Sequence, residues 1–296
     1  LRYGHDSKIR PEILEAIIDI VPYVEPYNWG GSDGFSTSYI RFNKEQKALY
    51  DPVIDSINVW FQENWSSLSM QEKMEWKYQR YMQDYLGTIS SVDDNLGRVL
   101  DYLEKSGLDK NTIVVYTSDQ GFYLGEHGWF DKRFIYDESF KTPLLIKWPG
   151  KITPGIRISK MVQNLDFAQT FLDAAKIKQP ADMQGESLMP LLLGQEENWN
   201  REAVYYHYYE YPAVHMVKRH YGIVTEDYKL AHFYYDIDEW ELYDRLADPM
   251  EMKNVYNDSS YKEIVKRLKT QLTDLRIKYK DSRELDLHYI NKYLDN

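Results

Sequence analysis

Apolar residues recur at gaps of three and four in two stretches of the first 103 residues, which is the spacing of one helix face. The shorter stretch covers residues 9–21. The longer stretch contains Tyr85, Ile89, Val92, Leu96, Val99 and Leu103. A capping box of Ser69 with Glu72 precedes it and Gly107 follows it, so residues 69–106 are predicted to be mostly helix.

Shorter apolar runs in the middle of the chain predict strands. Residues 112–117 and 143–148 form two such runs, with a glycine-rich loop between them. A strand-like run over residues 159–162 precedes a helical pattern over residues 165–175. Strands that alternate with helices in this way indicate an α/β sheet with helices on its faces.

The pattern changes near residue 198. Four apolar and aromatic runs joined by polar turns follow, at residues 203–209, 221–224, 228–234 and 240–244. Such short spacing is typical of antiparallel strands. The amphipathic residues 261–279 then predict a helix that can cover this second sheet. We therefore divide the chain into residues 1–198, with the α/β sheet, and residues 199–296, an α+β subdomain.

The composition narrows the classes of partner. Of 296 residues, 43% are hydrophobic and 28% charged, as in a globular protein. The formal net charge of -11 argues against a surface for nucleic acid or acidic lipid. No apolar run is long enough to span a membrane. The chain has no cysteine, which excludes a disulfide or a thiolate site within it. Because residue 1 is not methionine, we expect a piece of a longer protein.

The loop between the first two predicted strands carries the candidate chemistry. Asp119 and Gln120 follow the first strand, and their carboxylate and amide oxygens suit Ca²⁺ or Mg²⁺. Two oxygens are too few for either ion, so other ligands must come from elsewhere. Lys132 offers an ammonium group that can bind an ester oxygen and offset its charge. His127 can donate a proton, orient a neighbour or be purely structural. The loop indicates a cation-assisted hydrolase of an anionic ester.

A turn-rich segment of the second sheet gathers charged and imidazole side chains. They are His207, Glu210, His215, Lys218, Arg219 and His220. Such a cluster can bind sugar hydroxyls or an anionic group of a substrate, against the acidic background of the whole chain. A solvated charged turn without a ligand is the alternative interpretation.

Five motifs occur in order along the chain. They are Asp119-Gln120-Gly121 with Gly125-Glu126-His127-Gly128 and Lys132, then Lys141-Thr142-Pro143-Leu144, Trp148-Pro149-Gly150, Gly185-Glu186-Ser187-Leu188 and Trp240-Glu241-Leu242-Tyr243-Asp244. Together they resemble the C-terminal half of the sulfatase motif set in the alkaline phosphatase superfamily. Residues 205–212 look most like sulfatases that remove 6-O-sulfate from N-acetylglucosamine-type sugars.

The resemblance implies a fold and a mechanism. The fold is an alkaline phosphatase-like α/β sheet with flanking helices, followed by a smaller antiparallel sheet packed with a helix. In sulfatases a Cys/Ser-x-Pro-x-Arg motif supplies formylglycine, whose hydrated form attacks sulfur while a divalent cation, usually Ca²⁺, neutralises the sulfate. Asp119 and Gln120 match two later metal ligands of the family. Lys132 matches the lysine that contacts the sulfate ester.

The chain also departs from the family pattern. It has no Cys/Ser-x-Pro-x-Arg motif and lacks the early Asp-Asp pair, both of which belong to the N-terminal half of a sulfatase. The resemblance therefore implies a truncated sulfatase that needs its own N-terminal portion and is inactive alone. It also implies a sulfated carbohydrate as partner and a periplasmic or secreted location, lysosomal in a eukaryote.

Two other functions remain open from the sequence. A phosphodiesterase or phosphonate monoester hydrolase of the same superfamily uses a similar metal pair and lysine. A non-catalytic carbohydrate-binding module would need neither the nucleophile nor the missing ligands. A comparison of the turnover of sulfate esters with that of phosphate esters distinguishes a sulfatase from the first alternative.

Overall fold

A computed structural model describes residues 41–212, 215 and 217–294 of the chain. The helix predicted over residues 9–21 lies outside these residues. The described residues divide into two compact units. One contains those up to Leu103 together with Leu124–Phe130, and the other contains Glu104–Tyr123 and the residues from Asp131 onward. The boundary predicted at residue 198 is a different division and stays a prediction.

The long predicted helix is present as α4 (Met70–Lys105). Its capping box is confirmed, because the Ser69 N–H donates to Glu72 Oε2 at 2.8 Å and the Glu72 N–H to Ser69 Oγ at 3.3 Å. Gly107 follows the helix with a left-handed φ of 72°. No residue of α4 is buried. Its exposed apolar side chains include Leu86, Ile89, Val92 and Val99.

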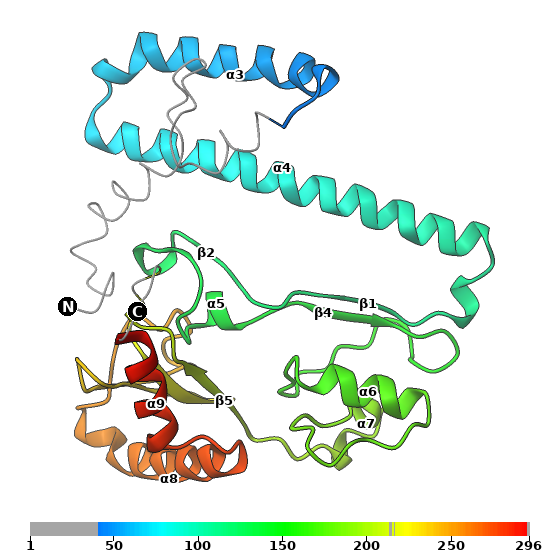
Figure 1. Ribbon diagram of the computed structural model, residues 1–296, viewed down its shortest axis with the longest axis vertical. Helices are drawn as coiled ribbons and strands as arrows, with labels where there is room; N and C mark the ends of the chain where they lie inside the picture. Colours follow the sequence, from blue (N-terminus) through cyan, green and yellow to red (C-terminus); the bar gives the residue numbers. More distant parts are fainter. Residues whose placement is uncertain (1–40, 213–214, 216, 295–296) are drawn as a thin grey trace. The chain divides into compact units, whose positions relative to one another are not determined.

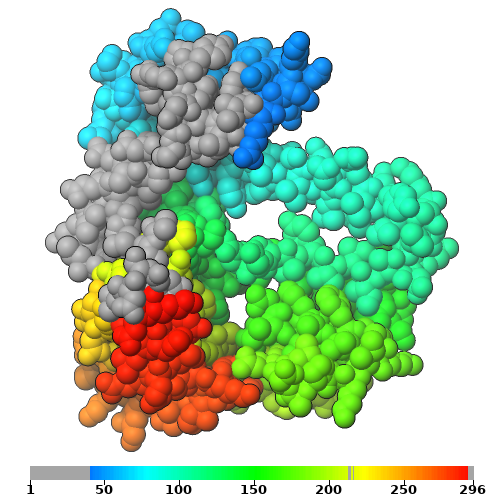
Figure 2. Space-filling view, in the orientation of Figure 1, coloured from blue at the N-terminus to red at the C-terminus, as the bar shows by residue number. Residues whose placement is uncertain are grey.

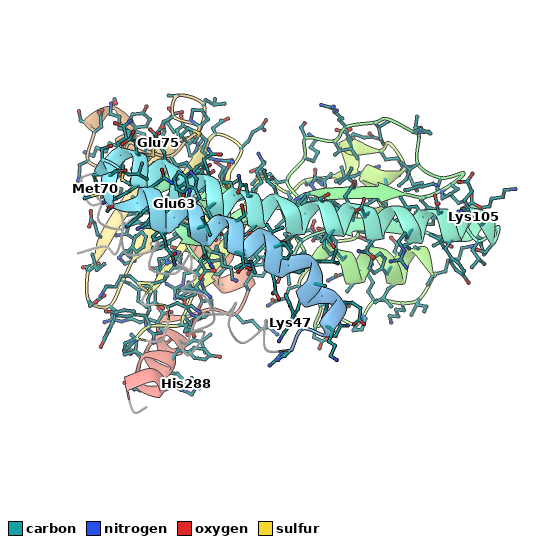
Figure 3. The ribbon with its side chains drawn as sticks, turned by 90° about the horizontal axis from the view of Figure 1, so that it is seen from above. Lys47, Glu63, Met70, Glu75, Lys105 and His288 are labelled. Atoms are coloured by element: carbon teal, nitrogen blue, oxygen red, sulfur yellow. The ribbon has the colours of Figure 1, made fainter. Side chains whose placement is uncertain are left out.

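A second helix, α3 (Lys44–Asn64), precedes α4 in the same unit, and the short η1 (Trp65–Ser67) joins the two. The helices run antiparallel, as the labels from Lys47 to Glu63 and from Met70 to Lys105 show (Figure 3). Aromatic rings hold the junction. The rings of Trp60 and Trp76 stack at 5.5 Å, and those of Phe61 and Trp65 at 4.6 Å.

In the other unit, the two strands predicted around the glycine-rich loop are confirmed. They are β1 (Val114–Thr117) and β4 (Leu144–Lys147), which pair antiparallel with Val114 opposite Lys147. In the sequence, η2 (Asp109–Asn111) precedes β1. Between β1 and β4 come β2 (Tyr123–Leu124), η3 (Glu126–Gly128), β3 (Phe130–Asp131) and α5 (Asp137–Phe140), of which η3 belongs to the first unit.

The helix predicted over residues 165–175 is confirmed as α6 (Asp166–Ala174). It is followed by α7 (Met189–Leu192) and η4 (Glu196–Asn198), and a small core of Leu188, Leu191, Leu192 and Trp199 forms here. The strand predicted over residues 159–162 is wrong. This segment is irregular, because the Met161 carbonyl accepts the Trp199 indole N–H at 3.0 Å and the Val162 side chain packs on the small core instead of joining a sheet.

The predicted C-terminal sheet is present in the order β5-β6-β7-β8, with every neighbouring pair antiparallel (Figure 1). The strands are β5 (Ala203–Tyr208), β6 (His220–Thr225), β7 (Tyr228–Phe233) and β8 (Glu239–Asp244). This sheet begins five residues after residue 198, where the pattern of the sequence changes.

The predicted covering helix is also confirmed. After η5 (Ser259–Tyr261), α8 (Lys262–Lys278) packs on the C-terminal sheet, and α9 (Arg283–Leu294) follows. The shared core consists of Ile223, Leu230, Leu242, Val255, Leu268 and Leu272. In the space-filling view α9, in red, lies directly against α8, in orange (Figure 2). Within the described residues, no helix is both long and apolar enough to cross a membrane.

Candidate functional site

Asp119 and Gln120 lie at the end of β1, as the sequence predicted for a cation site. Asp119 is exposed, and the Ser118 hydroxyl donates to the Gln120 carbonyl oxygen at 2.8 Å. The next residue must be glycine, because a Cβ atom on Gly121 would lie 2.0 Å from the carbonyl oxygen of Glu138. The Gly121 N–H donates to the Ser139 carbonyl oxygen at 2.8 Å. These contacts fix the end of β1 against α5.

Lys132 lies in a strained turn that leads into α5. Its neighbours Asp131 and Arg133 have φ angles of 78° and 100°, which non-glycine residues seldom adopt. The Lys132 Nζ is 3.3 Å from Asp131 Oδ1, and the Arg133 guanidinium also pairs with Asp131. The Lys132 side chain is 31% exposed, so it can reach a ligand in solvent.

Ser139 joins these two segments. Its carbonyl oxygen accepts the Gly121 N–H at 2.8 Å, and its hydroxyl accepts the Arg133 N–H at 2.7 Å. The side chain is buried, so both bonds are shielded from water. One residue therefore links the segment that carries the candidate cation ligands to the turn that carries the candidate ester-binding lysine. No sequence pattern marks Ser139, because a single serine in a polar turn has no characteristic spacing.

His127 lies in η3 with a φ of 55° and is buried. Its ring stacks on Trp129 with centroids 5.7 Å apart. It belongs to the compact unit that contains α3 and α4, whereas Asp119, Gln120 and Lys132 belong to the other unit. Its predicted catalytic role stays a prediction.

The donor set at the end of β1 fits a hard divalent cation. Asp119 offers carboxylate oxygens and Gln120 an amide oxygen, and hard cations prefer both types. The fit is partial, because Ca²⁺ takes about six to eight oxygen ligands and Mg²⁺ about six. Further ligands are required before this end of the strand can bind either ion tightly.

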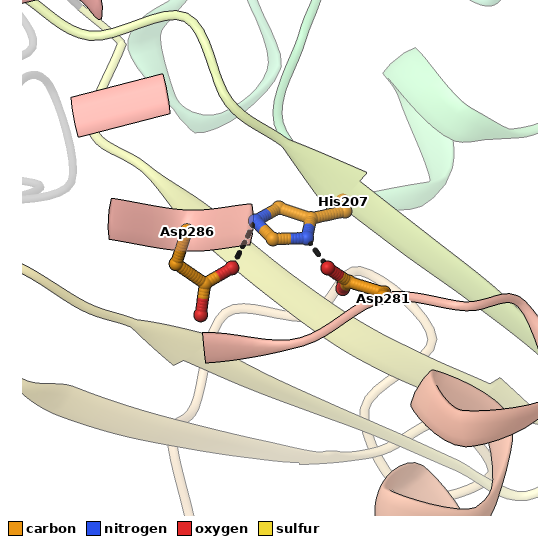
Figure 4. A group of neighbouring side chains, drawn as sticks. All are labelled: His207, Asp281 and Asp286. Carbon is orange, nitrogen blue, oxygen red and sulfur yellow. Dashed lines mark hydrogen bonds and ion pairs between the residues drawn. The ribbon is translucent and has the colours of Figure 1, made fainter. Parts of the chain in front are cut away.

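His207, predicted to bind substrate, has a side chain only 3% exposed. Its Nδ1 is 2.8 Å from Asp281 Oδ2 and its Nε2 is 3.7 Å from Asp286 Oδ1 (Figure 4). The Nε2 is also 2.7 Å from the Tyr234 hydroxyl. Burial lowers the pKa of His207 despite the attraction of Asp281. Burial raises the pKa of Asp281, but the hydrogen bonds that its carboxylate accepts outweigh burial and hold the pKa well below its usual range.

The group of His207, Asp281 and Asp286 has the composition of a metal site, with ligand atoms within 4.8 Å of one another. An arginine already compensates its charge. The Arg276 Nη2 is 2.8 Å from Asp286 Oδ2, and its Nε is 3.3 Å from Asp281 Oδ2. Tyr205 and Tyr209 hydroxyls donate to Asp281 as well. This group is therefore an internal polar network that joins β5 to α8 and α9.

Two more of the predicted substrate ligands, Arg219 and His220, are fully buried. The Arg219 Nε donates to the Tyr211 carbonyl oxygen at 2.6 Å and its Nη2 to the Tyr289 carbonyl oxygen at 3.0 Å. His220 Nδ1 is 2.8 Å from the Lys218 carbonyl oxygen, and aromatic rings surround the imidazole. Burial lowers the pKa of His220 to about 3.

The other three predicted substrate ligands keep contact with solvent. Glu210 accepts the Tyr208 hydroxyl at 2.7 Å and lies 3.2 Å from His215 Nδ1. The Tyr208 hydrogen bond is the main reason that the pKa of Glu210 is lowered. Lys218 pairs with Asp236 and also donates to the Tyr211 hydroxyl. The six predicted residues thus separate into three buried and three accessible side chains, a difference that the sequence did not show.

Residues 30–177 match the family described as sulfatase, and residues 125–278 match N-sulphoglucosamine sulphohydrolase, C-terminal. The chain belongs to the sulfatase family. Sulfatases in general work with a divalent cation and a formylglycine nucleophile. The candidate cation ligands and Lys132 all lie within the matched ranges.

Similarity to individual sulfatases is high over part of their length. The chain is 55% identical over 212 residues to an N-acetylglucosamine-6-O-sulfatase of Bacteroides thetaiotaomicron, covering 71% of this chain and 38% of that protein. It also resembles a solved protein in complex with its substrate D-glucosamine-2-N,6-O-disulfate, with a TM-score of 0.80, 40% identity, and 92% and 63% of the two chains covered. The chain therefore spans 38% of the first relative and 63% of the second, in both cases less than two thirds of their length.

A third relative is a hydrolase of another ester class. The phosphonate monoester hydrolase of Agrobacterium radiobacter matches with a TM-score of 0.62 and 26% identity, covering 69% of this chain and 42% of that one. Together the structural neighbours confirm the predicted alkaline phosphatase-like fold, of which the chain contains a part. They also show that one fold accommodates sulfatases and phosphonate hydrolases.

Proposed function

We propose that this chain is the C-terminal part of a sulfuric ester hydrolase that removes sulfate, at the 6-O position, from an N-acetylglucosamine-type sugar. One observation carries the proposal. The segment with Asp119 and Gln120 and the turn with Lys132 are both hydrogen-bonded to Ser139. A cation and an ammonium group held on these segments can flank one anionic ester. The 55% identity to an N-acetylglucosamine-6-O-sulfatase supports the substrate class.

Each residue of the site has a proposed role. Asp119 and Gln120 supply part of the ligand set of a divalent cation, which is Ca²⁺ in our proposal with Mg²⁺ as the alternative. The cation would neutralise the charge of the sulfate when bound. Lys132 donates hydrogen bonds to an ester oxygen and offsets the charge that develops there. His127 is the proposed proton donor or orienting group.

The nucleophile and the remaining cation ligands are proposed to lie in a preceding part of the protein, which carries the formylglycine motif. Exposed apolar surface supports this. None of the residues of α4 is buried, and in the β1–β4 pair Tyr116 is 39% and Leu145 61% exposed. Burial of such surface contributes about 25 cal/mol per Å² to stability. We propose that the preceding part covers it and completes the site, and that the whole protein is periplasmic or secreted, or lysosomal in a eukaryote.

Burial refines the proposed substrate contacts. Glu210, His215 and Lys218 are accessible and are the proposed ligands of the sugar or of a neighbouring anionic group. His207, Arg219 and His220 are buried, so they would act on a substrate only by supporting the strands and turns that carry the accessible residues. For the three buried residues, this supporting role replaces the direct substrate contact that the sequence predicted.

The experiment uses the full-length protein that contains this chain. We expect turnover of N-acetylglucosamine-6-sulfate and a loss of about 10²–10³-fold in kcat/KM for Lys132→Ala, as for removal of one group that stabilises transition-state charge. Lys178→Ala is the matched control, since Lys178 is exposed and lies outside the site. Faster turnover of a phosphonate monoester or phosphodiester would favour the alternative. Binding of the sugar without turnover of any ester would favour a non-catalytic module.

A further inference from the structure

The main chain on both sides of Lys132 is held in an unusual conformation. Asp131 and Arg133 have φ angles of 78° and 100° although neither is glycine. Such conformations persist only where surrounding contacts enforce them. The direction in which Lys132 leaves the turn therefore depends on whatever holds its two neighbours.

Two side chains hold the Arg133 peptide groups, one from six residues and the other from 73 residues further along the chain. The Tyr206 hydroxyl donates to the Arg133 carbonyl oxygen at 2.5 Å, and the Ser139 hydroxyl accepts the Arg133 N–H at 2.7 Å. The Arg133 guanidinium closes the turn by pairing with Asp131. Both hydrogen-bonding groups of one residue are thus occupied, and rotation of the backbone beside Lys132 would break them.

Tyr206 is itself firmly placed. It lies in β5 opposite Gly222 of β6, and its ring packs edge-on against Phe140 at 5.3 Å and beside His220 at 5.6 Å. Burial raises the pKa of Tyr206, so the hydroxyl remains protonated and able to donate. The C-terminal sheet therefore reaches the Lys132 turn through a rigid aromatic side chain.

We propose that Tyr206 is a positioning residue for catalysis: it fixes the main chain of the Asp131–Arg133 turn so that Lys132 points at the sulfate ester. The inference rests on the proposed function, because it assumes that Lys132 contacts the ester. It assigns the C-terminal sheet a part in the chemistry in addition to substrate binding. Tyr206 acts only through Lys132, and this dependence can be measured.

The test is a double-mutant cycle in the full-length protein with N-acetylglucosamine-6-sulfate as substrate. Tyr206→Phe removes the hydroxyl and keeps the ring. We expect kcat to fall about tenfold while KM changes less than twofold, because the interaction of Lys132 strengthens with charge development. In a Lys132→Ala background, Tyr206→Phe should change kcat less than twofold. Ser139→Ala, a second route to the same turn, should behave in the same way.

Tyr261→Phe is the matched control. It removes one tyrosine hydrogen bond, to Asp244 at 3.0 Å, far along the chain from the turn, and should leave kcat unchanged. A thermal melt of each variant shows whether it folds. If Tyr206→Phe lowers kcat by the same factor with and without Lys132, its effect is a general structural one and the inference is wrong.

The outcomes also separate this inference from the proposed function. A large loss for Lys132→Ala with no loss for Tyr206→Phe or Ser139→Ala would overturn the positioning role alone. Full activity of Lys132→Ala would overturn both the role of Lys132 and the inference built on it. Tenfold losses that vanish in the Lys132→Ala background would support both.

Discussion

The helices α8 and α4 have similar amphipathic patterns but opposite surroundings. α8 has 17 residues and buries Leu268 and Leu272 against the C-terminal sheet. α4 has 36 residues and buries none. Full burial of one leucine contributes about 1.5–3 kcal/mol, so α8 is held by tertiary packing and α4 mainly by its own hydrogen bonds and caps. An apolar stripe predicts that a helix has a partner, but it does not show which part of the protein supplies that partner.

Charged groups show the same contrast. In the C-terminal region Lys229 is fully buried between Glu251, at 2.6 Å, and Asp137, at 2.8 Å, and Arg245 pairs with Asp137 as well. Burial raises the pKa of Glu251, whereas for Asp137 the two cations outweigh burial and lower the pKa. On α4 the Arg80–Asp84 pair is partly exposed, and such pairs contribute about 0.3–0.5 kcal/mol.

The largest effect is expected from Lys229→Met. It leaves Glu251 and Asp137 in a buried site with Arg245 as the remaining cation, and removal of one partner of a buried pair costs about 3–5 kcal/mol. The free energy of unfolding, measured by urea denaturation with circular dichroism, should fall by about 4 kcal/mol. Lys266→Met on the exposed side of α8 is the control and should change it by less than about 0.5 kcal/mol. If both variants lower the free energy of unfolding equally, the ion-pair network around Lys229 does not contribute to stability.

A second experiment compares leucines of the two helices directly. Leu268→Ala should lower the free energy of unfolding of this chain by about 3 kcal/mol, because it opens a cavity in the C-terminal core. Leu86→Ala on α4 should change it by less than about 0.5 kcal/mol, because Leu86 is 55% exposed. In the full-length protein we expect Leu86→Ala to cost more than in this chain. An unchanged cost would mean that nothing covers this face of α4.

The smallest effect concerns pH. The pKa of His220 is about 3 in the folded chain and about 6.5 when unfolded, so unfolding takes up a proton between these values. Stability from this group is complete above pH 6.5 and is lost as the pH falls toward 3. Between pH 6.5 and 5 the loss should be about 2 kcal/mol, and His220→Phe should remove this part of the slope. An identical pH slope in the variant would show that His220 titrates normally.

Much of the fold could be predicted because its signals are local. The capping box at Ser69, the strand pattern before Asp119 and the apolar face of residues 261–279 each depend on neighbours in sequence. The strand predicted at residues 159–162 failed for the opposite reason. Its apolar residues follow a strand pattern, but Val162 packs on the small core and the Met161 carbonyl bonds to Trp199, so the segment is irregular.

The sequence alone determined the order of the elements, the sulfatase motifs and the residues Asp119, Gln120 and Lys132 as candidates for the site. Only the tertiary structure decided which charged residues of the C-terminal part are accessible. It also showed that Ser139 and Tyr206 hold the turn beside Lys132, the latter across 73 positions of sequence. The physical reason is that burial and long-range hydrogen bonds depend on which surfaces meet, and periodicity and motif spacing do not encode that.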